Sequence, residues 1–201
     1  VNGKGIKGPG IDLFRSIKKK LGYLPIIAED LGVITDEVKE LRDKAGLPGM
    51  KVLEFAYSVD EVKQNGMVNY FMPHMYDTNN CVVYTGTHDN DTLQGWLENC
   101  GDEQIAMIAS YFEGKEIEPV KAKALVKSGQ LRKDFIKSAL SSTAVFAVIP
   151  MQDIIGLGNE ARMNTPSTTG ANWAWRMQTG QLKTKAAEEL KFLAALYGRN
   201  L

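Results

Sequence analysis

The stretch CVVYTGTHDNDT, residues 81–92, contains the pattern that decides the fold of this chain. It opens with a short, largely apolar run at 81–85, and polar and charged residues follow at once. A helical pattern then begins near Thr92, with Leu93 and Leu97 on its apolar face. Short apolar runs with abrupt ends are typical of strands buried in a parallel sheet. The stretch therefore predicts a strand, a polar loop and a connecting helix.

The same unit recurs along the chain. Apolar runs at 26–28, 50–57 and 143–149 predict three more strands, the last followed by a polar loop at 151–153. Strands that alternate with helices pair in parallel through right-handed crossovers, so the predicted class is α/β. Helical spacing of apolar residues predicts helices over 11–21 and 35–45, from Thr92, Asp102 and Pro119, around 131–139, and over 184–197 with Thr184 as its cap.

Four such units are half the number that a closed barrel needs. An eight-unit barrel typically takes about 250 residues, whereas this chain has 201. The units therefore form either a small doubly wound sheet or half of a (β/α)8 barrel with an open edge on each side. The chain opens VNGKGIKGPG without a methionine, which indicates a loop taken from a longer protein.

Composition excludes several classes of protein. The chain is 44% apolar and 24% charged, which is the balance of a globular protein rather than a disordered one. Lys plus Arg and Asp plus Glu each number 24, so no global field favours nucleic acid or an anionic membrane. No apolar stretch approaches the ~18 residues that cross a bilayer. Cys81 and Cys100 lack a Cys-x-x-Cys spacing, which favours two reduced thiols in a cytosol-like compartment.

No cofactor is predicted. His74 and His88 have no third ligand at helix or hairpin spacing, so the sequence predicts no metal site. Gly156-x-Gly158 lacks the third glycine and the strand-turn-helix context of a dinucleotide fingerprint.

Ionisable side chains follow two of the predicted strands. Glu29 and Asp30 come directly after the run at 26–28, and His88, Asp89 and Asn90 follow the run at 81–85. Catalytic groups of parallel α/β proteins lie at the carboxyl ends of the strands. One carboxylic acid held protonated donates a proton to a leaving oxygen, and a second, ionised one stabilises positive charge on a sugar ring. The alternative is structural, because acidic residues after strands also form turns and cap helices.

Trp173 and Trp175 leave two interpretations open. Their rings could stack on the faces of sugars, or they could fill a core, which is the commoner fate of tryptophan.

Six short motifs of the sequence then favour one family. The chain closely resembles the 4-α-glucanotransferases, also called amylomaltase or disproportionating enzyme, over essentially its whole length. The words that carry the resemblance are, in order, IIAEDLGVIT at 26–35, GMKVL at 49–53, YTGTHDNDT at 84–92, QDIIGLG at 152–158, EARMN at 160–164 and NWAWR at 172–176.

The resemblance implies a TIM barrel of the α-amylase superfamily in which three acids act together. They are a nucleophilic Asp after the fourth strand, an acid/base Glu after the fifth and a stabilising Asp after the seventh. Glu29 matches the acid/base and Asp89 the stabiliser, while His88 matches the histidine that binds glucose at subsite −1. The further candidates for substrate binding are Asp30, Asn90, Arg162, Asn164 and Trp173.

On this resemblance, residues 1–201 are the C-terminal half of the barrel, strands five to eight, in a single incomplete domain. The nucleophile is expected in an Arg-x-Asp-His type motif upstream of Val1, since no Asp of this chain is followed by His. The expected partners are α-1,4-glucans and the missing N-terminal half, in the cytoplasm or, in a plant or alga, the plastid stroma. Two alternatives stay open: a non-catalytic glucan-binding fragment and an α-glucan hydrolase.

Overall fold

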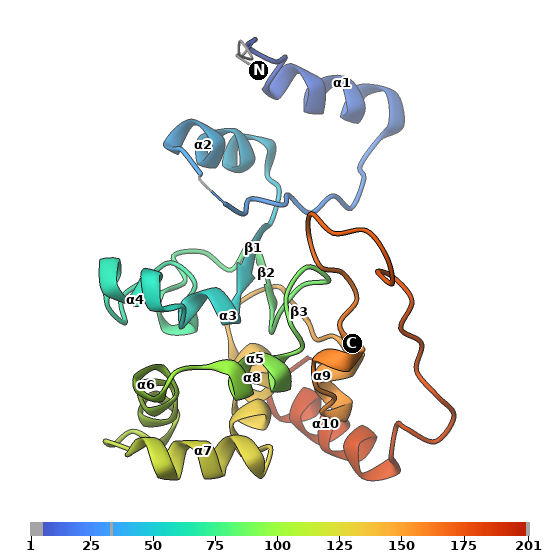
Figure 1. Ribbon diagram of the computed structural model, residues 1–201. Helices are drawn as coiled ribbons and strands as arrows, with labels where there is room; N and C mark the ends of the chain where they lie inside the picture. The colour runs from blue at the N-terminus through green and yellow to red at the C-terminus, as the bar shows by residue number, and fades with distance from the viewer. Residues whose placement is uncertain (1–5, 33, 200–201) are drawn as a thin grey trace.

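A parallel sheet lies at the centre of the molecule, and helices surround one of its faces (Figure 1). The computed structural model describes residues 6–32 and 34–199, so residues 1–5 of the opening stretch, Val33 and residues 200–201 lie outside it. The sheet has the order β1-β2-β3, with β1 at Gly49–Val52, β2 at Cys81–Tyr84 and β3 at Phe146–Val148. Both pairs of strands are parallel, which confirms the predicted α/β class.

Helices connect and cover these strands. Most begin where the sequence predicts: Thr92 caps α5 by accepting a hydrogen bond from the Gly95 amide, and Pro119 takes the first position of α7. The helices are α1 Ile11–Leu21, α2 Asp36–Ala45, α3 Leu53–Ala56, α4 Val59–Asn65, α5 Leu93–Asn99, α6 Asp102–Glu113, α7 Pro119–Lys127, α8 Gln130–Ser141, α9 Met151–Ile155 and α10 Thr184–Leu196, with short 3-10 turns η1 Pro73–Met75 and η2 Asn159–Ala161.

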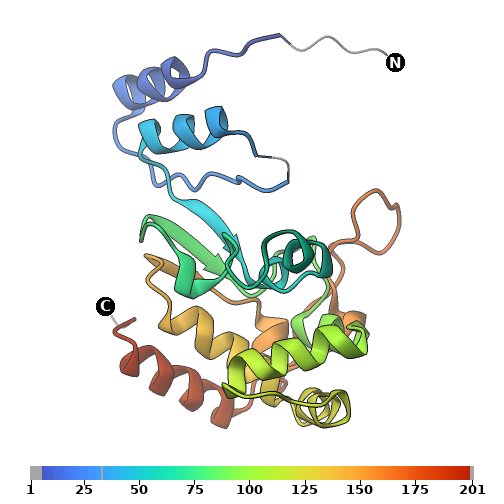
Figure 2. The ribbon, with the colours of Figure 1, turned by 90° about the vertical axis from the view of Figure 1, so that its left-hand side faces the viewer.

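The core lies between the sheet and helices α5 to α8, below the sheet in Figure 2. Cys81 and Val83 of β2 point into it, where they join a cluster that includes Leu93 and Phe135. Side chains alternate along a strand, so Phe146 and Val148 of β3 point to the opposite face. There they are 59% and 44% exposed. One face of the sheet is therefore packed, and the other opens toward solvent at β3.

Helices α1 and α2 lie apart from this core, above the sheet in both views (Figures 1 and 2). Neither helix contains a buried residue. Segment 22–35 joins the two helices and carries the predicted acid Glu29. None of the helices among residues 6–32 and 34–199 combines the length and the apolar character that crossing a bilayer requires.

The predicted strand at 26–28 is wrong, so the described part of the chain has three strands rather than four. The Ala28 amide donates to the Pro48 carbonyl at 2.9 Å, but proline has no amide hydrogen with which to continue a ladder. The amide of Met50 in β1 is also taken, because it donates to the Asp30 side chain at 2.7 Å. Segment 26–28 is therefore bonded to the residue before β1 without joining the sheet.

Three further expectations need correction. The run at 50–57 is a strand only as far as Val52 and then turns into helix α3, where Leu, Glu and Ala are good helix formers. The expected polar loop at 151–153 is the first part of helix α9. Thr184 is the first residue of α10 rather than its cap, because Lys183 takes the cap position.

Candidate active site

A cleft of about 820 Å³ lies where β1 and β2 end. Its lining comes from segment 27–32, from Met50 and Phe55 of β1 and α3, from the end of β2 and the loop 86–90 after it, from the end of β3, and from Pro166. Among these described lining residues the carboxylates are Glu29 and Asp89. The fold thus brings the two predicted catalytic acids, 60 positions apart in sequence, to one cleft.

Glu29 is exposed on the cleft, while its neighbour Asp30 is buried. One oxygen of Asp30 accepts from the Met50 amide at 2.7 Å, and the other pairs with Arg42 at 2.6 Å. Arg42 lies on α2 and also donates to the Tyr70 hydroxyl at 2.8 Å. Both oxygens of Asp30 are therefore engaged inside the protein, and Asp30 fixes the backbone next to Glu29 rather than lining the cleft.

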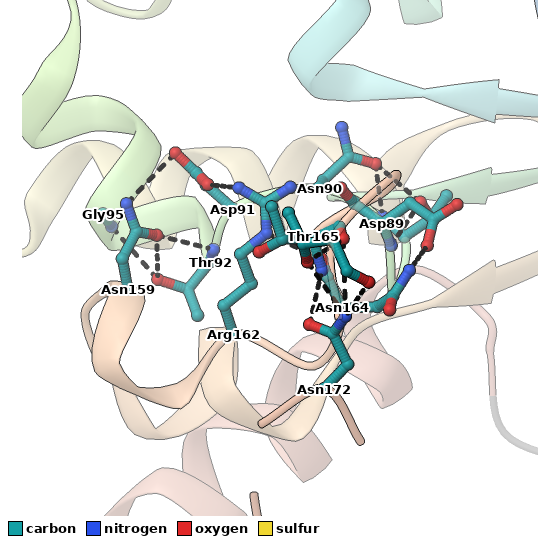
Figure 3. Close-up of polar contacts among 12 residues, drawn as sticks. Asp89, Asn90, Asp91, Thr92, Gly95, Asn159, Arg162, Asn164, Thr165 and Asn172 are labelled. Atoms are coloured by element: carbon teal, nitrogen blue, oxygen red, sulfur yellow. Dashed lines mark hydrogen bonds and ion pairs between the residues drawn. The ribbon is translucent and has the colours of Figure 1, made fainter. Parts of the chain in front are cut away.

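On the other side of the cleft, Asp89 is held by its neighbours. One oxygen of Asp89 accepts from the Asn164 side-chain amide at 2.6 Å (Figure 3). The same oxygen lies 3.3 Å from His88 Nε2. The Asn164 backbone amide donates to the His88 carbonyl at 3.1 Å. The ring of Trp173 lies 5.0 Å from the imidazole of His88, at an interplanar angle of 37°.

Arg162 connects several residues on this side of the site through an ion pair and hydrogen bonds. Its guanidinium pairs with the Asp91 carboxylate and donates to the Asp89 carbonyl at 2.6 Å and to the Asn164 carbonyl at 2.8 Å (Figure 3). Asn159 adds a second link, since its side chain donates to Asp91 at 3.1 Å and accepts from the Thr92 amide at 3.1 Å. The Arg162 donors are thus used to hold the loop after β2 against the segment after η2.

The remaining predicted site residues lie near the cleft in different ways. Asn90 lines it, and its side-chain oxygen accepts from both the amide and the hydroxyl of Thr87 at 2.9 and 2.7 Å. Trp173 is 52% exposed, so it is not a core residue, and its backbone has φ +63°, in the left-handed region that a tryptophan seldom adopts. The structure therefore leaves its ring free on the surface beside His88.

Two buried carboxyl groups under this loop were missed by sequence reasoning. Asp153, 1% exposed, accepts from the Thr85 hydroxyl at 2.6 Å and from the Leu93 amide at 2.8 Å, and burial raises its pKa. Glu54 is 3% exposed, and burial raises its pKa well above the usual value. Asp153 lies shortly after β3, as His88 and Asp89 lie shortly after β2. Glu54 was missed because it lies within the run 50–57, which was predicted to be a strand throughout.

Comparison with known proteins gives a consistent result. The family model for 4-alpha-glucanotransferase matches residues 1–183. The chain is 41% identical over 201 residues to the 4-alpha-glucanotransferase of Synechocystis, covering all of this chain and 36% of that protein. It is 43% identical over 196 residues to the chloroplastic/amyloplastic 4-alpha-glucanotransferase of Arabidopsis thaliana, covering 96% of this chain and 31% of that protein.

A solved structure agrees with these relatives. The amylomaltase from Streptococcus agalactiae in complex with acarbose superposes with a TM-score of 0.80 at 34% identity. The match covers 96% of this chain and 36% of that one. The chain thus spans about a third of the length of the relatives that it matches.

Proposed function

The chain belongs to the 4-alpha-glucanotransferase family, and from this premise we propose that it is the part of such an enzyme that carries the acid/base and the stabilising carboxylate. The whole enzyme transfers α-1,4-glucan segments between maltodextrins by a retaining double displacement. The observation that carries the proposal is that Glu29 and Asp89 line one cleft, with His88 beside them. The acarbose held by the similar amylomaltase supports an oligosaccharide as the ligand of this cleft.

Glu29 acts on protons in both halves of the proposed reaction. It first gives its proton to the glycosidic oxygen as the bond between this oxygen and the anomeric carbon breaks. The anomeric carbon bonds meanwhile to an aspartate from outside this chain. In the second half Glu29 takes the proton of an acceptor 4-hydroxyl, whose oxygen displaces that aspartate. Because Glu29 is exposed here, bound glucan and further protein have to exclude water from the site.

The loop after β2 supplies the proposed contacts to the sugar at the reacting bond. Asp89 stabilises the positive charge that develops at the anomeric carbon. His88 and Asn90 line the cleft and offer hydrogen bonds to sugar hydroxyls. The exposed ring of Trp173 suits stacking on an apolar sugar face. In this proposal Asn164 and Arg162 orient Asp89 through their hydrogen bonds, and Asp30 orients Glu29.

We further propose that residues 1–201 are the C-terminal half of a (β/α)8 barrel. Segment 26–28, β1, β2 and β3 then take the places of strands five to eight. A fourth strand from outside the chain would pair with segment 26–28, and a first strand would pair with the free edge of β3. The exposed apolar side chains of Phe146 and Val148 support this arrangement, because closure of the barrel would bury them. The cytoplasm or, as for the Arabidopsis relative, a plastid is the proposed location.

The decisive assay uses maltotriose and the longest polypeptide in which this chain is naturally encoded. Transfer converts maltotriose into glucose and longer maltodextrins while the number of reducing ends stays constant. Hydrolysis raises that number, so an increase matching the loss of substrate would replace the proposal with a hydrolase. If a folded polypeptide gives neither transfer products nor hydrolysis products, both the proposed transferase and the alternative hydrolase are contradicted.

The isolated 201-residue chain provides a second arm. We expect it to bind maltoheptaose saturably in calorimetry but to give no redistribution of chain length, because the nucleophile is outside it. Redistribution by the isolated chain at a rate close to that of the longer polypeptide would contradict the proposed division of catalytic groups.

A further inference from the structure

Glu54 is a buried acid that the proposed reaction does not use, yet it lies directly beneath the loop that carries His88 and Asp89. It follows β1, and its backbone amide donates to the Thr85 carbonyl at 3.3 Å. A Cβ built on Gly86 would lie 2.6 Å from Glu54 Oε1, so the carboxyl group fills the space that a side chain at position 86 would need. Glu54 therefore contacts the loop at its first residue.

The groups around Glu54 favour its protonated form. Burial is the main cause that raises its pKa, and the negative charges of Asp153 and Asp91 raise it further. The polar side chain of Asn90 and the positive charge of Arg162 lower the pKa of Glu54, but each has a smaller effect than burial. Cys100 also faces Glu54, and its own pKa rises to about 12, first because of burial and then because of Glu54.

The surrounding charges are already paired with other groups. Arg162 pairs with Asp91, and both oxygens of Asp153 accept hydrogen bonds from Thr85 and Leu93. Oε1 of Glu54 has no hydrogen-bond partner among the described residues. An unpaired ionised oxygen in such a place would carry a large desolvation cost, whereas a neutral carboxylic acid carries far less.

We propose that Glu54 is a positioning residue: packed against Gly86 beneath the loop 86–91, it holds this loop where His88 and Asp89 face the cleft. Asn90 links the two ends of this loop, because its side-chain oxygen accepts hydrogen bonds from both the amide and the hydroxyl of Thr87. Ionisation of Glu54 would place a charge under the loop and disturb it. The link from loop position to glucan transfer rests on the proposed function, whereas the support of the loop does not.

The test observes the loop itself. The sample is the 201-residue chain, which has two histidines. Replacing the exposed His74 therefore leaves His88 as the single imidazole in its NMR spectrum. In a His74→Gln background we compare Glu54 with Glu54→Gln, which keeps shape and polarity but cannot ionise, and with Glu54→Met, which keeps bulk alone. Glu103→Gln, on the exposed first turn of α6, is the matched control.

The His88 ring shifts and the exchange protection of the Asn90 amide, which donates to Thr87, are followed between about pH 5 and 9. We expect Glu54→Gln to match the Glu54 protein at low pH and to lack its additional change toward alkaline pH. Glu54→Met should shift the His88 signal and reduce Asn90 protection throughout. Glu103→Gln should follow the Glu54 protein at every pH.

The proposal is overturned if Glu54→Met reproduces the Glu54 spectra, because bulk alone would then suffice, or if Glu54→Gln keeps the alkaline change. If Glu54→Met does not fold, the comparison with Glu54→Gln decides. In the longer polypeptide, Glu54→Met should lower kcat more than it raises KM. If the longer polypeptide with the native Glu54 gives no glucan transfer, the proposed function is refuted. The NMR result on the position of the loop does not depend on that outcome.

Discussion

The two sides of the cleft are anchored by different means. Glu29 belongs to segment 22–35, between two helices without buried residues, and one buried carboxylate, Asp30, joins this segment to β1 and to Arg42. Asp89 belongs to a loop that is held by hydrogen bonds from Asn164 and Arg162. The Glu29 side therefore depends mainly on one buried carboxylate, Asp30, whereas the Asp89 side divides its support among several groups.

A second layer reinforces this contrast. On the Glu29 side, Tyr70 binds Arg42 through its hydroxyl, and the ammonium of the buried Lys51 lies on the Tyr70 ring and donates to its carbonyl at 3.1 Å. This forms a single chain of contacts that ends at Asp30. On the Asp89 side, Asp153 and Glu54 lie below the loop at separate points. The following experiments test whether a chain of contacts is more fragile than a network.

The largest effect is expected from Glu29→Gln in the longer polypeptide. The change removes the proposed proton donor but keeps the shape, so transfer from maltotriose should fall by about 10²–10⁴-fold, the usual contribution of general acid–base catalysis. The unfolding midpoint should not move. The same rate measured for Glu103→Gln, an exposed and remote glutamate, serves as the control, and transfer retained in Glu29→Gln would show that another group is the acid/base.

Asp30→Ala should be the most damaging change to stability. It removes the buried carboxylate partner of Arg42 and leaves Arg42 with the more exposed Asp43, at 2.8 Å, and breaking a buried pair typically costs about 3–5 kcal/mol. Both side chains are well buried, at 9% and 3% exposure for Arg42 and Asp30, so solvent should relieve little of this cost. Denaturant unfolding measures the total, and hydrogen exchange at the Met50 amide should show where it acts. Asp36→Ala, at a 91% exposed position on α2, should change stability far less.

Arg162→Lys should have a smaller effect than Asp30→Ala. A lysine keeps the charge but cannot reach Asp91, Asp89 and Asn164 at once, and one lost bond to a charged group costs about 1.5–3 kcal/mol at most. Hydrogen exchange in the loop 86–91 should rise while the core amides stay protected. A loss as large as that of Asp30→Ala would refute the view that support on this side is shared.

The smallest effect is a dependence on pH. Burial lowers the pKa of Lys51 to about 8. Between about 8 and the ~10.4 of an unfolded lysine, the unfolded chain binds more protons than the folded one, so the free energy of unfolding gains a contribution that rises with pH. Lys51→Met removes this contribution. The stability of Lys51→Met relative to Lys51 should therefore decline across this window, as measured by urea unfolding at pH 7, 9 and 10. Parallel pH curves would contradict the prediction.

Local sequence signals predicted some elements of the fold and not others. Residues 81–92 identified β2, its polar loop and the start of α5, because apolar periodicity and the cap at Thr92 are local signals. The same reasoning failed at 26–28, since whether an apolar run becomes a strand depends on partners with free backbone groups. The amide of Met50 already donates to Asp30, so it could not donate to segment 26–28. Strand formation is a property of the pair, not of the run.

Site residues divide in the same way. Resemblance to the family selected Glu29, His88 and Asp89, and the fold places all three on one cleft. It did not reveal that Asp30 and Arg162 turn inward.

The sequence by itself determined the α/β class, most helix boundaries and the chemistry available at the strand ends, because these follow from spacing and residue type along the chain. The tertiary structure alone decided that Asp153 meets Thr85, 68 residues away, and that Glu54 lies under Gly86. It also decided which polar side chains face the cleft and which face the protein. The physical reason is burial: a carboxyl group changes its partners and its protonation when it leaves water, and only the packed molecule establishes which groups do so.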